Sequence, residues 1–131
     1  MNAFSQTPAV GSGTLTIKAN NFSSDEGNAI VRLFRRDDDM PMKAFMEVTG
    51  KIIDRKSTLT FVDIPFGEYA AILFQDQNSN GTLDHNFLGL PKEPIGFSNG
   101  WNLTAFSGMP NFSKLKFEFS EQKPECKIDM K

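Results

Sequence analysis

The segment at residues 76–84 has the clearest capacity for chemistry in this chain, because acidic or amide side chains stand at positions 76, 78, 80 and 84. The spacing Asp-x-Asn-x-Asn-Gly is the opening pattern of a calcium-binding loop. Calcium takes about six to eight oxygen ligands, and a sharp turn at Gly81 would let alternate side chains converge on one ion. The sequence therefore predicts a calcium-stabilised loop. Its candidate ligands are Asp76, Asn78, Asn80, Thr82 (through its carbonyl) and Asp84.

The same segment departs from an EF-hand calcium loop at both of its ends. The last ligand of such a loop is normally a bidentate Glu, but Phe87 stands there, so Asn86 or Glu93 would have to supply a further oxygen. The residues before the segment follow a strand pattern rather than a helical one. Asn80-Gly81 is also a strong β-turn dipeptide. The sequence leaves open the alternative of a turn that binds no metal.

Catalytic side chains are the next possibility. His85 is the single histidine, and hydrolysis by a triad would require Ser98 and Asp84 beside it. Neighbouring residues on a strand point to opposite faces, which separates His85 from Asp84. A carboxylate pair such as Asp84 and Glu93 would act on glycosidic bonds only at about 5–10 Å separation in a cleft. We predict a non-enzymatic protein without catalytic residues. The alternative is a small hydrolase that uses Asp84, Glu93 or His85.

Aromatic side chains accumulate in the region after Asp76. Phe97 and Trp101, together with Glu93, form a possible ligand surface that could stack on a sugar or cover a partner peptide. Burial of these rings in a small second core is the favoured interpretation, since loop aromatics are most often buried. A partner bound at this surface would be a protein, a peptide or a carbohydrate.

Alternating apolar residues predict the strands that must position these side chains. Residues 67–75 are apolar on both faces, which predicts a central strand. One face of that strand carries Tyr69, Ala71 and Leu73, and the other carries Ala70, Ile72 and Phe74. The other expected strands are residues 14–19, 29–35, 43–48, 51–54, 58–62 and 114–119.

Many short strands separated by turn residues indicate an all-β domain, and we expect a seven-strand-type antiparallel β-sandwich. Tyr69 follows a turn at the start of the central strand, as in the tyrosine corner of immunoglobulin-type sandwiches. The fold is therefore expected to be immunoglobulin-like or transthyretin-like, with a long ordered loop after the central strand. A transthyretin-like oligomeric carrier is a further functional alternative, and the sequence leaves the oligomeric state open.

Length and composition restrict the number of domains and the kinds of partner that the chain could have. The 131 residues fit one domain, which we place at residues 13–121, between a flexible lead-in at 1–12 and a C-terminal tail at 122–131 that holds Cys126 as a free thiol. The net charge of −2 does not favour nucleic-acid binding. The longest apolar run, residues 69–74, is far shorter than the roughly 20 residues of a membrane-spanning helix. No signal peptide is visible, and the small residues Ala3 and Ser5 on either side of Phe4 suggest that one has been trimmed.

A longer pattern extends across residues 61–99. It reads Gly67-x-Tyr69-Ala70, Phe74-x-Asp76-x-Asn78-x-Asn80-Gly81-x-x-Asp84-x-Asn86, Gly89-x-Pro91-x-Glu93 and Gly96-Phe97-Ser98-Asn99. This pattern resembles an uncharacterised bacterial family, domain of unknown function 2141. The resemblance implies a secreted or periplasmic β-sandwich and implies no activity. We therefore expect an extracytoplasmic binding or envelope-associated module in which the acidic segment and Phe97 belong to one surface feature.

Overall fold

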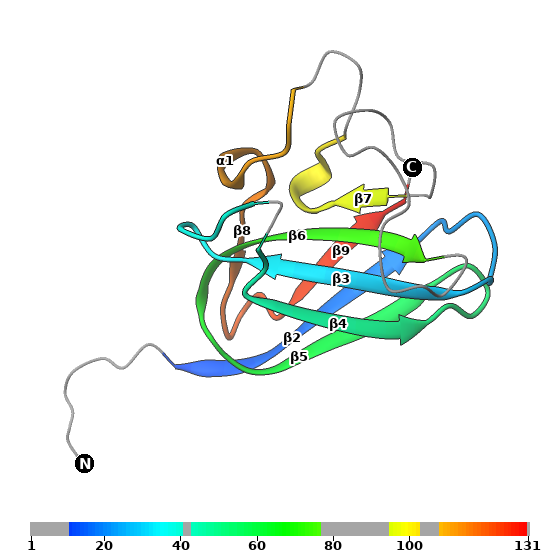
Figure 1. Cartoon of the computed structure of the whole chain (residues 1–131). Coiled ribbons are helices and arrows are strands. Elements are labelled where there is room, and N and C mark those ends of the chain that lie inside the picture. Colours follow the sequence, from blue (N-terminus) through cyan, green and yellow to red (C-terminus); the bar gives the residue numbers. More distant parts are fainter. Residues whose placement is uncertain (1–10, 41–42, 77–94, 103–107, 131) are drawn as a thin grey trace.

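The computed structural model describes residues 11–40, 43–76, 95–102 and 108–130. Its strands form two sheets that pack face to face, so the predicted all-β sandwich is confirmed (Figure 1). The first sheet has the order β5 (Ser57–Pro65), β2 (Ser12–Asn20) and β9 (Glu125–Asp129). The second sheet has the order β4 (Met46–Lys51), β3 (Asn28–Phe34), β6 (Gly67–Asp76) and β7 (Ile95–Phe97), and β8 (Phe117–Phe119) also pairs with β6. Two short helical segments, η1 (Ser98–Gly100) and α1 (Phe112–Leu115), precede β8.

Strand β6 is central, as its apolar pattern predicts. It pairs with β3 over Ala70–Asp76, with β8 over Gly67–Tyr69 and with β7 over Ile72–Phe74. Its two faces enter different cores. Tyr69, Ala71 and Leu73 lie in the core between the sheets, whereas Ala70, Ile72 and Phe74 lie in a second core on the other face of the same sheet. The alternation predicted from the sequence is therefore confirmed residue by residue.

The tyrosine corner is also present. The hydroxyl of Tyr69 donates a hydrogen bond of 2.6 Å to the carbonyl of Pro65, which lies just before the turn into β6. Gly67 has a φ of 157°, a conformation that side chains rarely adopt, and it allows this turn. The bond fixes how the chain passes from the first sheet into the second.

The structure corrects the expectation of a C-terminal tail at residues 122–131. Glu125–Asp129 form β9, and Cys126, at 8% exposure, lies in the core between the sheets rather than in a loose tail. Strand β9 pairs parallel with β2, so the first sheet is mixed rather than wholly antiparallel. Cys126, Ile128 and Met130 alternate along the chain and are buried, which was the available sequence signal.

Two strand boundaries also differ from expectation. The strand predicted at 114–119 begins as α1, and only Phe117–Phe119 form β8. The side chain of Asn111 accepts a hydrogen bond of 3.0 Å from the amide of Lys114, an N-terminal cap that favours the helical turn. The strand expected at 43–48 lies at Met46–Lys51, and the expected strand at 51–54 is the beginning of a hairpin turn that bridges Ile53 with Lys56.

Candidate functional site

Asp76 is the one predicted calcium ligand within the described residues. It is the last residue of β6, it is opposite Asn28 of β3, and only 1% of it is exposed. A charged side chain is rarely buried to this degree unless it is compensated by a hydrogen bond, an opposite charge or a metal. Its position is where the acidic segment leaves the sheet. The other predicted ligands (Asn78, Asn80, Thr82 and Asp84) and the alternatives His85, Asn86 and Glu93 lie outside the described residues.

The neighbouring Gln75 is fully buried and fixes the loop at residues 21–27 beside Asp76. Its side-chain nitrogen Nε2 donates to the carbonyl oxygens of Ser24 and Glu26, each at 3.0 Å. Its oxygen Oε1 accepts a hydrogen bond of 3.2 Å from the hydroxyl of Ser23. The sequence analysis missed this residue, although a polar side chain at the end of an apolar run was a signal that could have identified it.

Asp25 extends the same hydrogen-bonded loop to the turn between β4 and β5. Its carboxylate accepts hydrogen bonds from the amides of Asp54 (3.0 Å) and Arg55 (2.7 Å). Both turn residues have positive φ values, 54° and 61°, which non-glycine residues adopt at a cost. Arg55 in turn donates from Nε to the carbonyl of Phe22 at 2.6 Å. Two loops and the end of β6 therefore form one rigid end of the sandwich, and Asp76 lies at that end.

Of the two aromatic residues in the predicted ligand surface, Phe97 lies in a core and Trp101 is partly exposed. Phe97, at 4% exposure, belongs to the second core, so its ring has no free face for a ligand. Trp101 packs edge-on against Phe97 with ring centroids 4.8 Å apart, and it stays partly exposed. The Nζ atom of Lys114 lies 5.7 Å from the centre of the Trp101 ring. The burial of Phe97 agrees with the interpretation that these rings form a small second core. Glu93 lies outside the described residues.

Ser98, the serine considered for a catalytic triad, has a structural role. It is fully buried, its hydroxyl accepts a hydrogen bond from the amide of Ala71 at 2.9 Å, and it donates to the carbonyl of Leu115 at 2.6 Å. The next residue, Asn99, has a φ of 60° and donates from Nδ2 to the carbonyl of Lys114 at 3.2 Å. The Gly96-Phe97-Ser98-Asn99 part of the sequence pattern therefore holds β6, β7 and the α1 region together.

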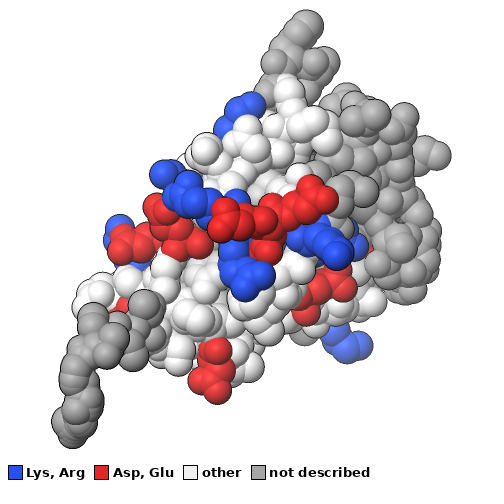
Figure 2. Space-filling model, turned by 60° about the vertical axis from the view of Figure 1, so that its left-hand side comes forward, with Lys and Arg blue, Asp and Glu red and all other residues white. Residues whose placement is uncertain are grey.

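Charged side chains alternate in sign across one face of the molecule (Figure 2). Ion pairs join Arg32 to Glu47 at 2.7 Å, Arg36 to Glu68 at 2.6 Å and Arg35 to Asp38 at 3.0 Å. The hydrogen bond from Arg35 holds the pKa of the Asp38 carboxyl below its usual value. The two charges of each pair have opposite signs and nearly cancel. The residues in these pairs therefore present no strong field of one sign to a nucleic acid.

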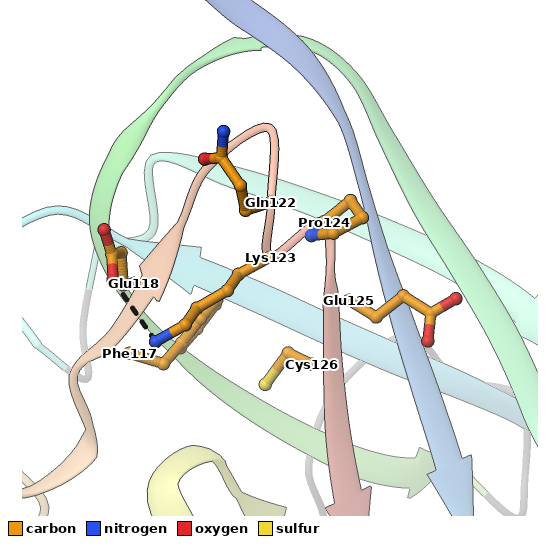
Figure 3. Close-up of a pocket in the computed structure, with 7 residues that line it drawn as sticks. All are labelled: Phe117, Glu118, Gln122, Lys123, Pro124, Glu125 and Cys126. Carbon is orange, nitrogen blue, oxygen red and sulfur yellow. Dashed lines mark ion pairs between the residues drawn. The ribbon is translucent and has the colours of Figure 1, made fainter.

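An open pocket of about 450 Å³ lies between β8 and β9 (Figure 3). Figure 3 shows Cys126 on β9, Phe117 and Glu118 on β8, and Lys123 in the connection, with an ion pair of 3.4 Å between Lys123 and Glu118. Burial raises the pKa of the Cys126 thiol to about 12. The thiol is therefore protonated near neutral pH, and it is not an activated nucleophile.

The residues that the structure describes contain no group of three or more His, Cys, Asp or Glu side chains placed to hold a metal ion. None of their helices is long and apolar enough to cross a membrane.

Fold and site together define a small mixed β-sandwich with a hydrogen-bonded loop end around a buried aspartate. A model of a family described as uncharacterised proteins conserved in bacteria, domain of unknown function 2141, matches residues 17–127. The chain belongs to this family, and the resemblance seen in its sequence pattern is confirmed. No curated protein and no solved structure is significantly similar to the chain.

Proposed function

We propose that the protein is an extracytoplasmic, non-enzymatic binding module whose segment after β6 is organised by calcium. The burial of Asp76 carries this proposal. Its carboxylate is a hard oxygen donor at the first position of the calcium-loop spacing, and it lies at 1% exposure where that segment leaves the sheet. Asn78, Asn80, the Thr82 carbonyl and Asp84 follow at the spacing that would complete the ligand set.

The surroundings of Asp76 suit a metal site because its backbone is already held in place. The Gln75 side chain anchors the loop at residues 21–27 through hydrogen bonds of 3.0 Å, and Asp25 anchors that loop to the β4–β5 turn. A ligand fixed by its own packing loses less entropy when it binds an ion.

The serine and tyrosine hydroxyls and the cysteine thiol considered below are engaged in contacts within the fold or buried, and this supports a non-enzymatic role. The hydroxyl of Ser98 is engaged between Ala71 and Leu115, and that of Tyr69 is engaged with Pro65. Burial raises the pKa of the Cys126 thiol to about 12, so its nucleophilic form is scarce. Each of these groups contributes to folding through its own contacts.

Thermal unfolding with calcium and with chelator tests the proposal. Calcium at about 100 times its dissociation constant should stabilise the protein by about 2.7 kcal/mol, which is a shift of about 10 °C for a domain of this size. Asp76→Asn should remove the shift. Asp39→Asn is the matched control, because Asp39 is exposed and lies in the β3–β4 loop. An unchanged melting temperature for the unaltered chain at millimolar calcium would contradict the calcium part of the proposal.

Binding and location need separate measurements. Trp101 is the single tryptophan, so its fluorescence reports directly on a peptide or a carbohydrate that binds beside it. We expect a spectral shift with such a ligand, and an unchanged spectrum at high concentrations of peptide and of carbohydrate would contradict binding beside Trp101. Fractionation of the native bacterium should find the chain outside the cytoplasm. Recovery in the cytoplasmic fraction alone would overturn the extracytoplasmic assignment.

A further inference from the structure

The hairpin that joins β4 to β5 borders a pocket of about 380 Å³. Its turn consists of Asp54 and Arg55, and the flanking residues Ile53 and Lys56 pair with each other. The amide of Ile53 donates to the carbonyl of Lys56 at 2.9 Å, and the amide of Lys56 donates to the carbonyl of Ile53 at 3.1 Å. Directly opposed residues of an antiparallel pair place their side chains on the same face, so Ile53 and Lys56 are neighbours on the hairpin surface.

Alternation along both strands decides which other side chains line this pocket. Ile52 and Ser57, next to the Ile53–Lys56 pair, point to the interior, and each is 5% exposed. One residue further from the turn, Lys51 and Thr58 return to the outer face and are exposed. The pocket is therefore lined by side chains of that face together with the edge of one buried serine: Lys51, Ile53, Lys56, Ser57 and Thr58.

The two lysines of the pocket are not neutralised within the fold. Across the part of the chain that the structure describes, neither Lys51 nor Lys56 forms an ion pair. The adjoining sheet adds further positive charge, because Lys18 of β2 lies in register with the β5 side of the pocket and stands opposite Lys127 of β9. Lys18 alone among these four pairs with a carboxylate, that of Glu125 at 3.4 Å. The pocket therefore lies in a locally positive region of a chain whose net charge is −2.

The backbone around the pocket is held in place by hydrogen bonds of its own. The hydroxyl of Ser57 donates to the carbonyl of Lys51 at 2.8 Å and joins the two strands beneath the pocket. The Asp25 carboxylate accepts from the turn amides of Asp54 and Arg55. Asp54 is the acidic residue of the turn, and it is not one of the residues that line the pocket. A site whose backbone is already ordered loses less free energy when a ligand binds.

We propose that this pocket binds a phosphomonoester that carries an apolar group. Two ammonium groups match the nearly two negative charges of a phosphomonoester, whereas a carboxylate offers only one. The Thr58 hydroxyl is placed to donate to a phosphate oxygen. Ile53, at 67% exposure, supplies an apolar surface beside the two charges. The site shares no residue with the acidic segment or with Trp101, so it stands or falls independently of the calcium and Trp101 proposals.

An NMR titration with phenyl phosphate, with chelator present to exclude calcium, tests the proposal. We expect saturable shifts of the amide signals of residues 51–58. Benzoate has the same ring and a single charge, and it should bind about ten-fold more weakly. Inorganic phosphate has the charge without the ring, and it should also bind about ten-fold more weakly because it leaves Ile53 uncovered. Signals that do not shift with up to about 10 mM phenyl phosphate overturn the proposal.

Substitutions separate the charged and apolar parts of the site. Lys51→Gln and Lys56→Gln should each raise the dissociation constant of phenyl phosphate by about ten-fold. Lys43→Gln removes the same charge from an exposed position in the β3–β4 loop, at the other end of β4, and should leave that constant unchanged. Ile53→Ser should weaken phenyl phosphate but not inorganic phosphate. Equal losses in Lys43→Gln and in the two pocket variants would overturn the proposal, since net charge alone would then explain the binding. Thermal melts confirm that each variant is folded.

Vesicle sedimentation identifies the source of the phosphomonoester. Phosphatidate carries this group at a membrane surface, so vesicles of phosphatidylcholine with phosphatidate are compared with vesicles of phosphatidylcholine alone. Sedimentation with the phosphatidate vesicles that Lys51→Gln abolishes would assign a lipid headgroup to the pocket. Binding of phenyl phosphate without sedimentation on either vesicle would assign a soluble phosphomonoester. Equal sedimentation of the unaltered chain and Lys51→Gln on phosphatidate vesicles would exclude the pocket as the lipid site.

Discussion

The hydroxyl of Ser98 bridges two segments that are distant in sequence, accepting from the amide of Ala71 at 2.9 Å and donating to the carbonyl of Leu115 at 2.6 Å. It lies where β6 passes from its pairing with β8 to its pairing with β7, so one side chain satisfies the backbone groups that neither short strand reaches. All three residues are fully buried. A polar contact in this position is expensive to lose, because water cannot replace it.

Ser98→Ala should therefore lower the free energy of unfolding by about 3 kcal/mol, since it leaves a buried donor and a buried acceptor without a partner. Urea-induced unfolding measures this loss. Ser120→Ala is the matched control, because the Ser120 hydroxyl accepts from the amide of Lys123 at an exposed turn. We expect that control to cost less than about 1 kcal/mol. Similar losses of unfolding free energy in both variants would show that the buried Ser98 bridge stabilises the fold no more than the exposed Ser120 hydrogen bond does.

Gly96 is required by the close approach of β7 to β9. A Cβ atom there would lie 2.7 Å from Cγ2 of Ile128 and 3.0 Å from Sδ of Met130. Gly96→Ala should destabilise the protein by about 1–3 kcal/mol, because one of the two strands must move. At Gly50 the nearest atoms are ends of the Leu59 and Ser57 side chains at 3.2 Å, so Gly50→Ala should cost less. The reverse order of melting temperatures would contradict this account of the β7–β9 contact.

The Cys126 thiol makes stability depend on pH in the alkaline range. Burial raises its pKa from an ordinary 9.0 to about 12, so the folded chain holds this proton more tightly than the unfolded chain does. The stabilisation is complete below pH 9 and is lost between pH 9 and about 12, at up to about 1.4 kcal/mol per pH unit. Burial raises the pKa of Tyr69 as well, so the stabilisation that this side chain contributes also falls as the pH rises.

Denaturant melts between pH 8 and pH 11 measure this dependence, with Cys126→Ala as the comparison. The variant should lose stability less steeply above pH 9 than the unaltered chain, because it retains only the Tyr69 contribution. Ellman's reagent provides a direct check, since it should react slowly with the folded chain and rapidly after unfolding. Equal slopes for the two proteins would show that the thiol titrates alike in the folded and unfolded states.

The fold could be predicted from the sequence where the signal is local. Side chains alternate across a strand with a period of two, so consecutive apolar residues from Tyr69 to Phe74 were enough to identify a central strand with both faces buried. The tyrosine corner was also visible, because Tyr69 and its acceptor Pro65 are four residues apart and joined by a turn. The sequence placed Asp76 directly after that strand, and the structure makes it the last residue of β6, where the candidate metal site begins.

Contacts between distant segments were decided by the tertiary structure alone. The alternation of Cys126, Ile128 and Met130 was a local sign that Glu125–Asp129 could form a strand. Its partner β2 lies more than 100 residues earlier in the chain, and only the tertiary structure brings the two strands together. The functions of Gln75, Ser98 and Gly96 depend in the same way on atoms that no local spacing brings together. Periodicity specifies which face of an element is buried, but the partner that buries it is chosen by packing and hydrogen bonding over the whole chain.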